Sequence, residues 1–271
     1  MPAPRPWLVA ALLCIGAGQA AIAQAAGSVF LEELTWTELR DEIRAGRTTV
    51  IVPVGGTEQS GPHIVLGKHN VRVRSLAGRI AASLGNAIVA PVIAYVPEGS
   101  IDPAAGHMRF AGTISIPEAA FEATLESAAR SFRKHGFRDI VLIGDHGGTQ
   151  KSLARVAAKL DREWGAASPA RVHAVEEYYR AGERGVADAL RKLGLSDAEI
   201  GVHAGAADTS LSLAVDEHLV RSSRLHDGST LGAADGVQGD PRRANIAAGR
   251  AAVDAVVART RDAIQREVAR R

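Results

Sequence analysis

The chain has 271 residues, of which 46% are hydrophobic, and its 32 basic and 30 acidic side chains give a net charge of +2. This near balance argues against binding of nucleic acid or an anionic membrane surface through overall charge, and the length suits one or two domains with an ordinary core. The only cysteine, Cys14, lies in the N-terminal segment, so the rest of the chain has neither a disulfide nor a thiol ligand or nucleophile.

The first residues are typical of a secretory signal peptide. Arg5 supplies a short positive region, and residues 7–17 form an apolar run that is too short to span a bilayer. Ala21-Ile22-Ala23 then has the small-x-small pattern that signal peptidase recognises. We therefore expect residues 1–23 to be removed and a mature chain of residues 24–271, without stable membrane insertion, to reside in the periplasm or outside the cell.

Strand and helix patterns alternate along the mature chain. Strands are predicted over residues 48–54, 87–95, 139–143 and 171–175, because these are short apolar or β-branched runs. Helices are predicted over residues 70–84, 117–136 and 150–164, where apolar side chains recur at helical spacing. This alternation predicts a single α/β domain over residues 24–271, with a mostly parallel sheet covered by helices on both faces.

Polar clusters follow two of these strands. The first covers residues 57–63 and continues to His69, and the second covers residues 144–148. A third, residues 201–210, precedes an apolar run, and His107 lies in a long Gly- and Pro-containing loop, residues 97–112, of a length typical of a functional lid. Ligands of open α/β sheets bind at the carboxyl ends of the strands. Histidines and carboxylates without cysteine favour zinc or manganese there.

The clusters resemble five motifs of the creatininase (creatinine amidohydrolase) family. Residues 53–63 are similar to P-x-G-x-x-E-Q-H-G-P-H, 107–115 to H-x-x-F-P-G-T-x-S, 144–148 to N-G-H-G-G, 203–210 to H-A-G-x-x-E-T-S, and 236–241 to G-V-x-G-D-P. The motifs occur in the family's order over nearly the whole mature chain. The resemblance implies a three-layer α/β/α sandwich, commonly a hexamer. It also implies a metal-dependent hydrolase of non-peptide C–N bonds in small cyclic or linear amides, with a metal-bound water as nucleophile.

Residue by residue, the resemblance shows departures at the expected metal site. Glu58 and His146 match family ligands, but Ser60 replaces a histidine, His69 replaces a bridging aspartate, and Gly148 replaces a glutamate. We therefore expect one divalent ion per chain, zinc in preference to manganese or iron, held by Glu58, His69 and His146. Two His and one Glu with an open position suit a catalytic zinc.

The remaining candidates are assigned through the same motifs. His203 matches the family's catalytic histidine, which would protonate the leaving nitrogen with a pKa near neutrality, and Asp208 stands where the family has glutamate. Four further residues are candidates for the pocket: Ser60, His63, His107 and Asp145. Residues 176–179 carry two glutamates and two tyrosines, and we expect them to form an exposed strand end.

The altered ligand set leaves two alternatives open. A periplasmic relative with a degenerate metal site would bind a small molecule or a partner without chemistry, and metal analysis separates it from an enzyme. The same machinery would also serve a lactone or ester hydrolase, which a substrate panel distinguishes. Creatinine itself is not favoured, because Trp164, Tyr178 and Tyr179 are the only aromatic residues between the second and third clusters and none stands in an obvious matching position.

Overall fold

A computed structural model describes residues 27–225 and 231–270. The expected signal peptide, residues 1–23, lies outside the described residues. Within the described part of the chain, no helix combines the length and the hydrophobicity that a membrane span requires.

The centre of the molecule is a parallel sheet of four strands in the order β2-β1-β3-β4. The strands are β1 (Thr49–Val54), β2 (Ala87–Val89), β3 (Asp139–Gly144) and β4 (Arg171–Ala174). β1 and β3 are fully paired, from Thr49 opposite Asp139 to Val54 opposite Gly144. The two strands therefore end side by side, and the turns that follow them begin next to each other.

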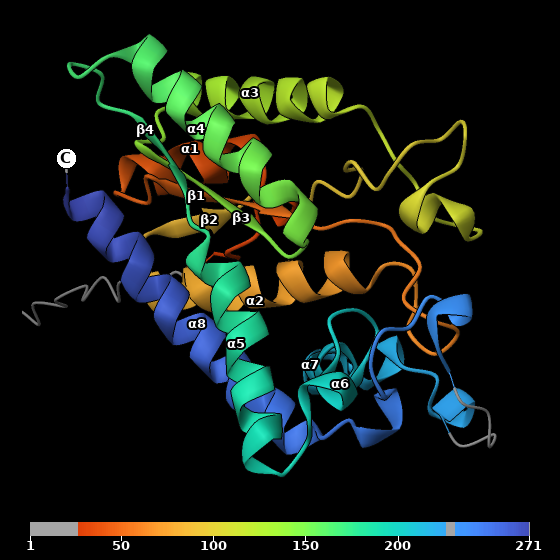
Figure 1. Cartoon of the computed structure of the whole chain (residues 1–271). Helices are drawn as coiled ribbons and strands as arrows, with labels where there is room; N and C mark the ends of the chain where they lie inside the picture. The colour runs from red at the N-terminus through yellow and green to blue at the C-terminus, as the bar shows by residue number, and fades with distance from the viewer. Residues whose placement is uncertain (1–26, 226–230, 271) are drawn as a thin grey trace, which may run out of the picture.

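Helices cover both faces of this sheet (Figure 1). On one face lie α1 (Trp36–Arg44), α3 (Glu118–His135) and α4 (Gln150–Trp164), and on the other α2 (Lys68–Leu84), α5 (Glu177–Lys192) and α8 (Ile246–Ala269). Val50 and Val52 pack in the first core and Ile51 in the second, because successive strand side chains point to opposite faces. The predicted three-layer α/β/α sandwich is confirmed.

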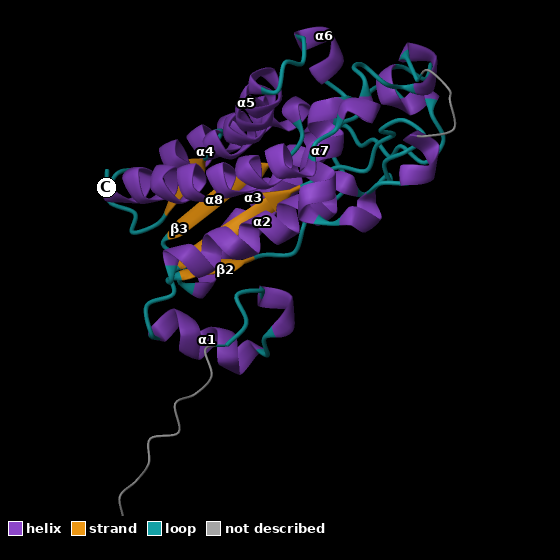
Figure 2. Cartoon of the chain, turned by 90° about the horizontal axis from the view of Figure 1, so that it is seen from below, coloured by secondary structure: helices purple, strands orange, loops and turns teal. Residues whose placement is uncertain are grey.

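Two short helices complete the fold beside α5 and α8: α6 (Asp197–Ile200) and α7 (Ala206–Val215). Loops gather at the end of the molecule opposite the C-terminus (Figure 2). The turns after β1 and β3, the long loop after β2 and the segment before α7 all contribute to the site described below.

The element boundaries agree with the prediction except in two places. β2 ends at Val89, earlier than expected, because Pro91 has no N–H with which to continue the ladder. Beyond Pro91 the chain pairs only through isolated bridges such as Val54 to Ile93. The expected strand end at residues 176–179 is wrong. These residues start α5. Tyr178 is buried, and its hydroxyl donates to Asp145 Oδ2 at 2.8 Å.

Candidate metal centre

Glu58, in the turn after β1, is the centre of the site. Its side chain is 1% exposed, and Oε2 has no hydrogen-bond partner among the described residues. Burial would raise the pKa of Glu58, but the imidazoles of His146 and His69 and the charge of Lys68 lower it well below its usual range. Five nitrogens surround the carboxylate: His69 Nε2 at 2.8 Å, His107 Nε2 at 3.2 Å, His146 Nε2 at 3.4 Å, Lys68 Nζ at 3.6 Å and His203 Nδ1 at 3.7 Å.

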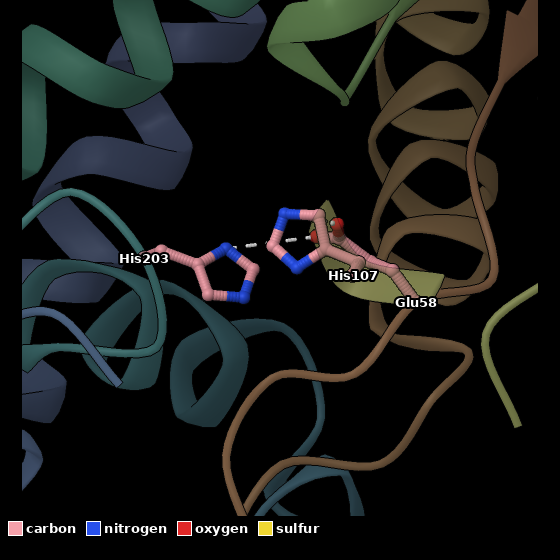
Figure 3. Close-up of side chains that lie close together, drawn as sticks. All are labelled: Glu58, His107 and His203. Carbon is pink, nitrogen blue, oxygen red and sulfur yellow. Dashed lines mark ion pairs between the residues drawn. The ribbon is translucent and has the colours of Figure 1, made fainter. Parts of the chain in front are cut away.

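Among the residues that the structure describes, two possible ligand groups share this carboxylate. Glu58, His69 and His146 form one, and Glu58, His107 and His203 form the other, with the ligand atoms of each group within 4.8 Å of one another. The first group consists of the three residues that the sequence predicted as ligands. Figure 3 shows the second group, in which both imidazoles extend toward Glu58.

His69 is oriented by a buried carboxylate. Its Nδ1 donates to Asp145 Oδ1 at 2.5 Å, which leaves Nε2 facing Glu58. Metal-binding histidines commonly have this second partner, because it fixes the tautomer that presents a lone pair to the ion. Burial would raise the pKa of Asp145, but the charge of Arg72 and the bond from His69 lower it. Asp145 is thus an ionised support for His69.

Two cationic side chains of α2 extend into the site. Lys68 and Arg72 are one helical turn apart on the face that continues with Leu76, and both side chains are buried. Lys68 Nζ lies 2.7 Å from Asp208 Oδ2, and Arg72 Nη1 lies 2.8 Å from Asp208 Oδ1. Despite burial, these charges lower the pKa of Asp208 well below its ordinary value, so its carboxylate holds no proton at neutral pH.

Gln59 orients two neighbouring imidazoles in opposite ways. Gly61 N–H donates to Gln59 Oε1 at 2.9 Å, which fixes the side-chain amide. Gln59 Nε2 then donates to His107 Nδ1 at 2.9 Å and to the carbonyl of Gly236 at 3.3 Å. His107 consequently carries its hydrogen on Nε2, which lies 3.2 Å from Oε2 of Glu58 without forming a hydrogen bond.

His203 has the complementary form. Its Nε2 lies 3.0 Å from the backbone carbonyl oxygen of Gln59 and 3.1 Å from the amide Nε2 of the same residue. The amide donates its two hydrogens to His107 and Gly236, and the carbonyl can only accept, so Nε2 of His203 carries the hydrogen and Nδ1 faces Glu58 as a lone pair. Burial, together with the charge of Lys68, lowers the pKa of His203 to about 4. The imidazole is therefore neutral at physiological pH, lower in pKa than the near-neutral value expected from the sequence.

Glu98 is part of the site, although the sequence analysis did not select it. Its side chain is fully buried, and Oε2 lies 3.2 Å from His146 Nε2 without forming a hydrogen bond. Burial and the neighbouring charge of Glu58 raise the pKa of Glu98 to about 9. The feature of the sequence that could have indicated Glu98 is its position in residues 97–112, the loop interpreted as a lid.

The other pocket candidates lie behind the ligand groups. Ser60 is fully buried, and its hydroxyl has no partner among the described residues. His63 is also fully buried, with Nε2 3.1 Å from Thr209 Oγ1 of α7. Burial and the charge of Lys68 lower the pKa of His63 to about 4. Gly148 leaves room for a ligand, because a Cβ there would lie 2.8 Å from Cε1 of His146.

These residues fit a divalent ion. A buried carboxylate oxygen without a partner, next to imidazole nitrogens, costs free energy unless a cation completes it. One carboxylate and two imidazoles suit zinc or manganese.

The comparisons with known proteins agree with this arrangement. The family described as "Creatininase: Creatinine amidohydrolase" matches residues 32–264. The chain is 39% identical over 119 residues to a mycofactocin precursor peptide peptidase of Mycolicibacterium smegmatis, and 33% identical over 119 residues to a creatinine amidohydrolase of Pseudomonas putida. These matches cover 42% and 44% of this chain and 45% of each relative, so less than half of either protein is aligned.

A solved structure described as "Creatininase Mn" superimposes over most of the chain. The TM-score is 0.71 with 27% sequence identity, over 89% of this chain and 98% of the other. The relative therefore shares the whole three-layer architecture.

Proposed function

The chain belongs to the creatininase family, and from this membership we propose that it is a divalent-metal hydrolase that cleaves a C–N bond of a small cyclic or linear amide. The observation that carries the proposal is the partnerless Oε2 of Glu58, which is buried among imidazoles. Glu58, His69 and His146 would hold the ion. When bound, it would supply Lewis-acid polarisation of a carbonyl and lower the pKa of a water molecule.

The charges of the site support one ion per chain. Asp145 and Asp208 are balanced by Arg72 and Lys68, with which they form ion pairs. Glu58 and Glu98 remain, and when both are ionised one divalent ion compensates them. Zinc is the expected ion, with manganese or iron as alternatives, because the imidazole-rich set suits all three.

His203 would move the proton. Its neutral imidazole has the lone pair of Nδ1 directed into the site, so it can accept a proton from an attacking water and release it to the leaving nitrogen. His107, held by Gln59, would donate from Nε2 to an oxygen that gains negative charge. Asp208 would act indirectly, since it accepts the N–H of Ala204 at 2.9 Å and so shapes the backbone next to His203.

Metal analysis is the direct test of the ligand assignment. We expect about one ion per chain in the reconstituted protein, and loss of that ion in Glu58→Gln and in His146→Ala. Ser60→Ala is the matched control and should keep the ion, because its hydroxyl lies outside both ligand groups. Two ions per chain would refute the single-ion proposal, and none would refute the enzyme in favour of a non-catalytic binding protein.

A substrate panel tests the reaction. It should contain creatinine and other cyclic amides, formamides, short peptides, lactones and esters. Short peptides are included because a 39% identical relative is a peptidase and a peptide bond is a linear amide. Turnover of lactones or esters alone would replace the C–N proposal by that of an ester hydrolase.

His203→Ala separates chemistry from binding on whichever substrate is found. General acid–base groups typically contribute about 10²–10⁴-fold in rate, so we expect a loss in this range with the metal content unchanged. Loss of the ion would identify His203 as a ligand, and unchanged turnover would leave it only a structural role.

A further inference from the structure

Glu98 has an environment that the proposed reaction does not yet explain. Its side chain is completely buried, yet neither carboxylate oxygen has a hydrogen-bond partner among the described residues. The two cations of the site, Lys68 and Arg72, form their short ion pairs with aspartates instead. A buried carboxyl group whose two oxygens have no partner is unfavourable by itself, which points to a cation beside it.

The surrounding chain holds Glu98 in place. Its backbone N–H donates to Ser115 Oγ at 3.0 Å, and Ser115 Oγ donates to the carbonyl of Gly99 at 2.8 Å. Val96 and Ser115 also form a bridge, so the loop is closed at its base next to Glu98. Gly56 provides the space, because a Cβ there would lie 2.8 Å from Oε1 of Glu98. The carboxylate is therefore positioned by several elements at once.

The distances between donor atoms indicate what Glu98 binds. Oε2 of Glu98 lies 3.2 Å and Oε2 of Glu58 lies 3.4 Å from one atom, Nε2 of His146. Around a tetrahedral zinc with bonds of about 2.0–2.2 Å, neighbouring donors are about 3.3–3.6 Å apart. We propose that Glu98 is a further protein ligand of the divalent ion, which it shares with Glu58 and His146. This inference rests on the proposed function, since it requires an ion at that position.

A second carboxylate changes the character of the site. Glu58 and Glu98 together neutralise a divalent ion, so the bound site has no net charge to stabilise in a buried setting. Glu98 also belongs to the same loop as His107, so ion binding ties this loop to the turns after β1 and β3.

The test is the affinity of the metal-free full-length mature chain for Zn²⁺ and Mn²⁺, measured by competition with a chromophoric chelator. Glu98→Gln keeps the shape and removes the charge, and we expect the affinity to fall by more than about 100-fold. Partners that only support a ligand contribute about 10–100-fold. Asp102→Asn, an exposed acid in the same loop, is the matched control and should bind as the wild type does. Glu98→Asp should retain more affinity than Glu98→Gln, because it keeps the charge.

Ser115→Ala gives an independent variant should Glu98→Gln fail to fold. It removes the hydroxyl that holds the backbone of Glu98, and we expect a loss of roughly tenfold. If the wild type binds the ion and Glu98→Gln binds it within about threefold, the carboxylate is not a ligand and only this inference fails. If the wild type binds no ion, the proposed function fails with it.

Discussion

Asp145 does not face the partnerless oxygen of Glu58, yet it determines how His69 is presented. Its Oδ1 accepts from His69 and from Arg72, and its Oδ2 accepts from Tyr178. The residue therefore connects the turn after β3 to α2 and α5. Support of this kind is as important to a metal centre as the ligands, because it orients the imidazole before the ion arrives.

Asp145→Asn should lower metal affinity by about 10–100-fold while leaving every ligand in place, because an amide supports His69 less well than a carboxylate does. It should also destabilise the fold, since Arg72 loses a buried ion pair, and breaking such pairs costs about 3–5 kcal/mol. Chelator competition and thermal unfolding measure the two effects. Tyr178→Phe is the milder comparison, because it removes a neutral partner of Oδ2 and keeps the charge. An equal loss of affinity would contradict the role of the Asp145 charge in orienting His69.

His63 makes stability depend on pH. The folded protein holds this imidazole neutral down to about pH 4, whereas the unfolded chain protonates it near pH 6.5. The unfolded state therefore binds more protons between these values, and stability is lost as the pH falls through them. A shift of this size amounts to up to about 3 kcal/mol.

His63→Gln should flatten the fall of Tm between pH 7 and pH 4.5 relative to the wild type. Calorimetry at several pH values provides the measurement. The control is His135→Gln, because His135 is an exposed side chain at the end of α3, and this variant should follow the wild-type curve. Parallel curves for the wild type and His63→Gln would show that His63 does not cause the pH dependence.

At the scale of elements, α7 and α8 come into close contact at a glycine of α8. A Cβ at Gly249 of α8 would overlap the carbonyl oxygen of Ser210 in α7. At Gly185 of α5, in contrast, a Cβ would lie at an ordinary 3.6 Å from Cα of Ala252. The two glycines both lie inside helices, but only the first is required by packing.

Alanine at these positions should therefore have opposite effects. Gly249→Ala should destabilise the protein by about 1–3 kcal/mol through overpacking, and would disturb the helix that follows His203. Gly185→Ala should stabilise it by about 0.4–1 kcal/mol, because alanine restricts the unfolded chain. Urea unfolding compares the variants, and stabilisation by both would refute the assignment of a close helix contact.

The elements also show where prediction from sequence succeeds. The apolar periodicity of residues 150–164 predicts the helix found there. The ends of β1 and β3 are predicted because each strand is a short apolar run followed by a glycine-containing turn. Lys68 and Arg72 were missed, although they occupy the apolar stripe of α2 at four-residue spacing with Leu76, a pattern that indicates buried charge. For Glu98, the sequence indicates only that its loop is functional. Loops have no periodic pattern from which the direction of a side chain can be predicted.

At the scale of the whole molecule, we propose that the protein is exported and that residues 1–23 are removed as a signal peptide. We expect protein recovered from the periplasm or medium of a bacterial host to begin near Gln24, as measured by intact mass. Replacing Ala21 and Ala23 by leucine should block cleavage and leave the longer chain. Exported protein that retains Met1 would contradict the proposal.

The buried ammonium of Lys68 has a consequence for how the protein depends on its surroundings. Lys68 lies beside Glu58 as a positive charge that is covalently part of the chain, so no chelator can remove it and no competing cation can replace it. Under the single-ion proposal, only one ion must then be bound from solution. When the ion is added back to metal-free protein, we expect activity to rise hyperbolically with the free ion concentration. The rise should be first order in the ion, without a sigmoidal threshold at low ion concentration.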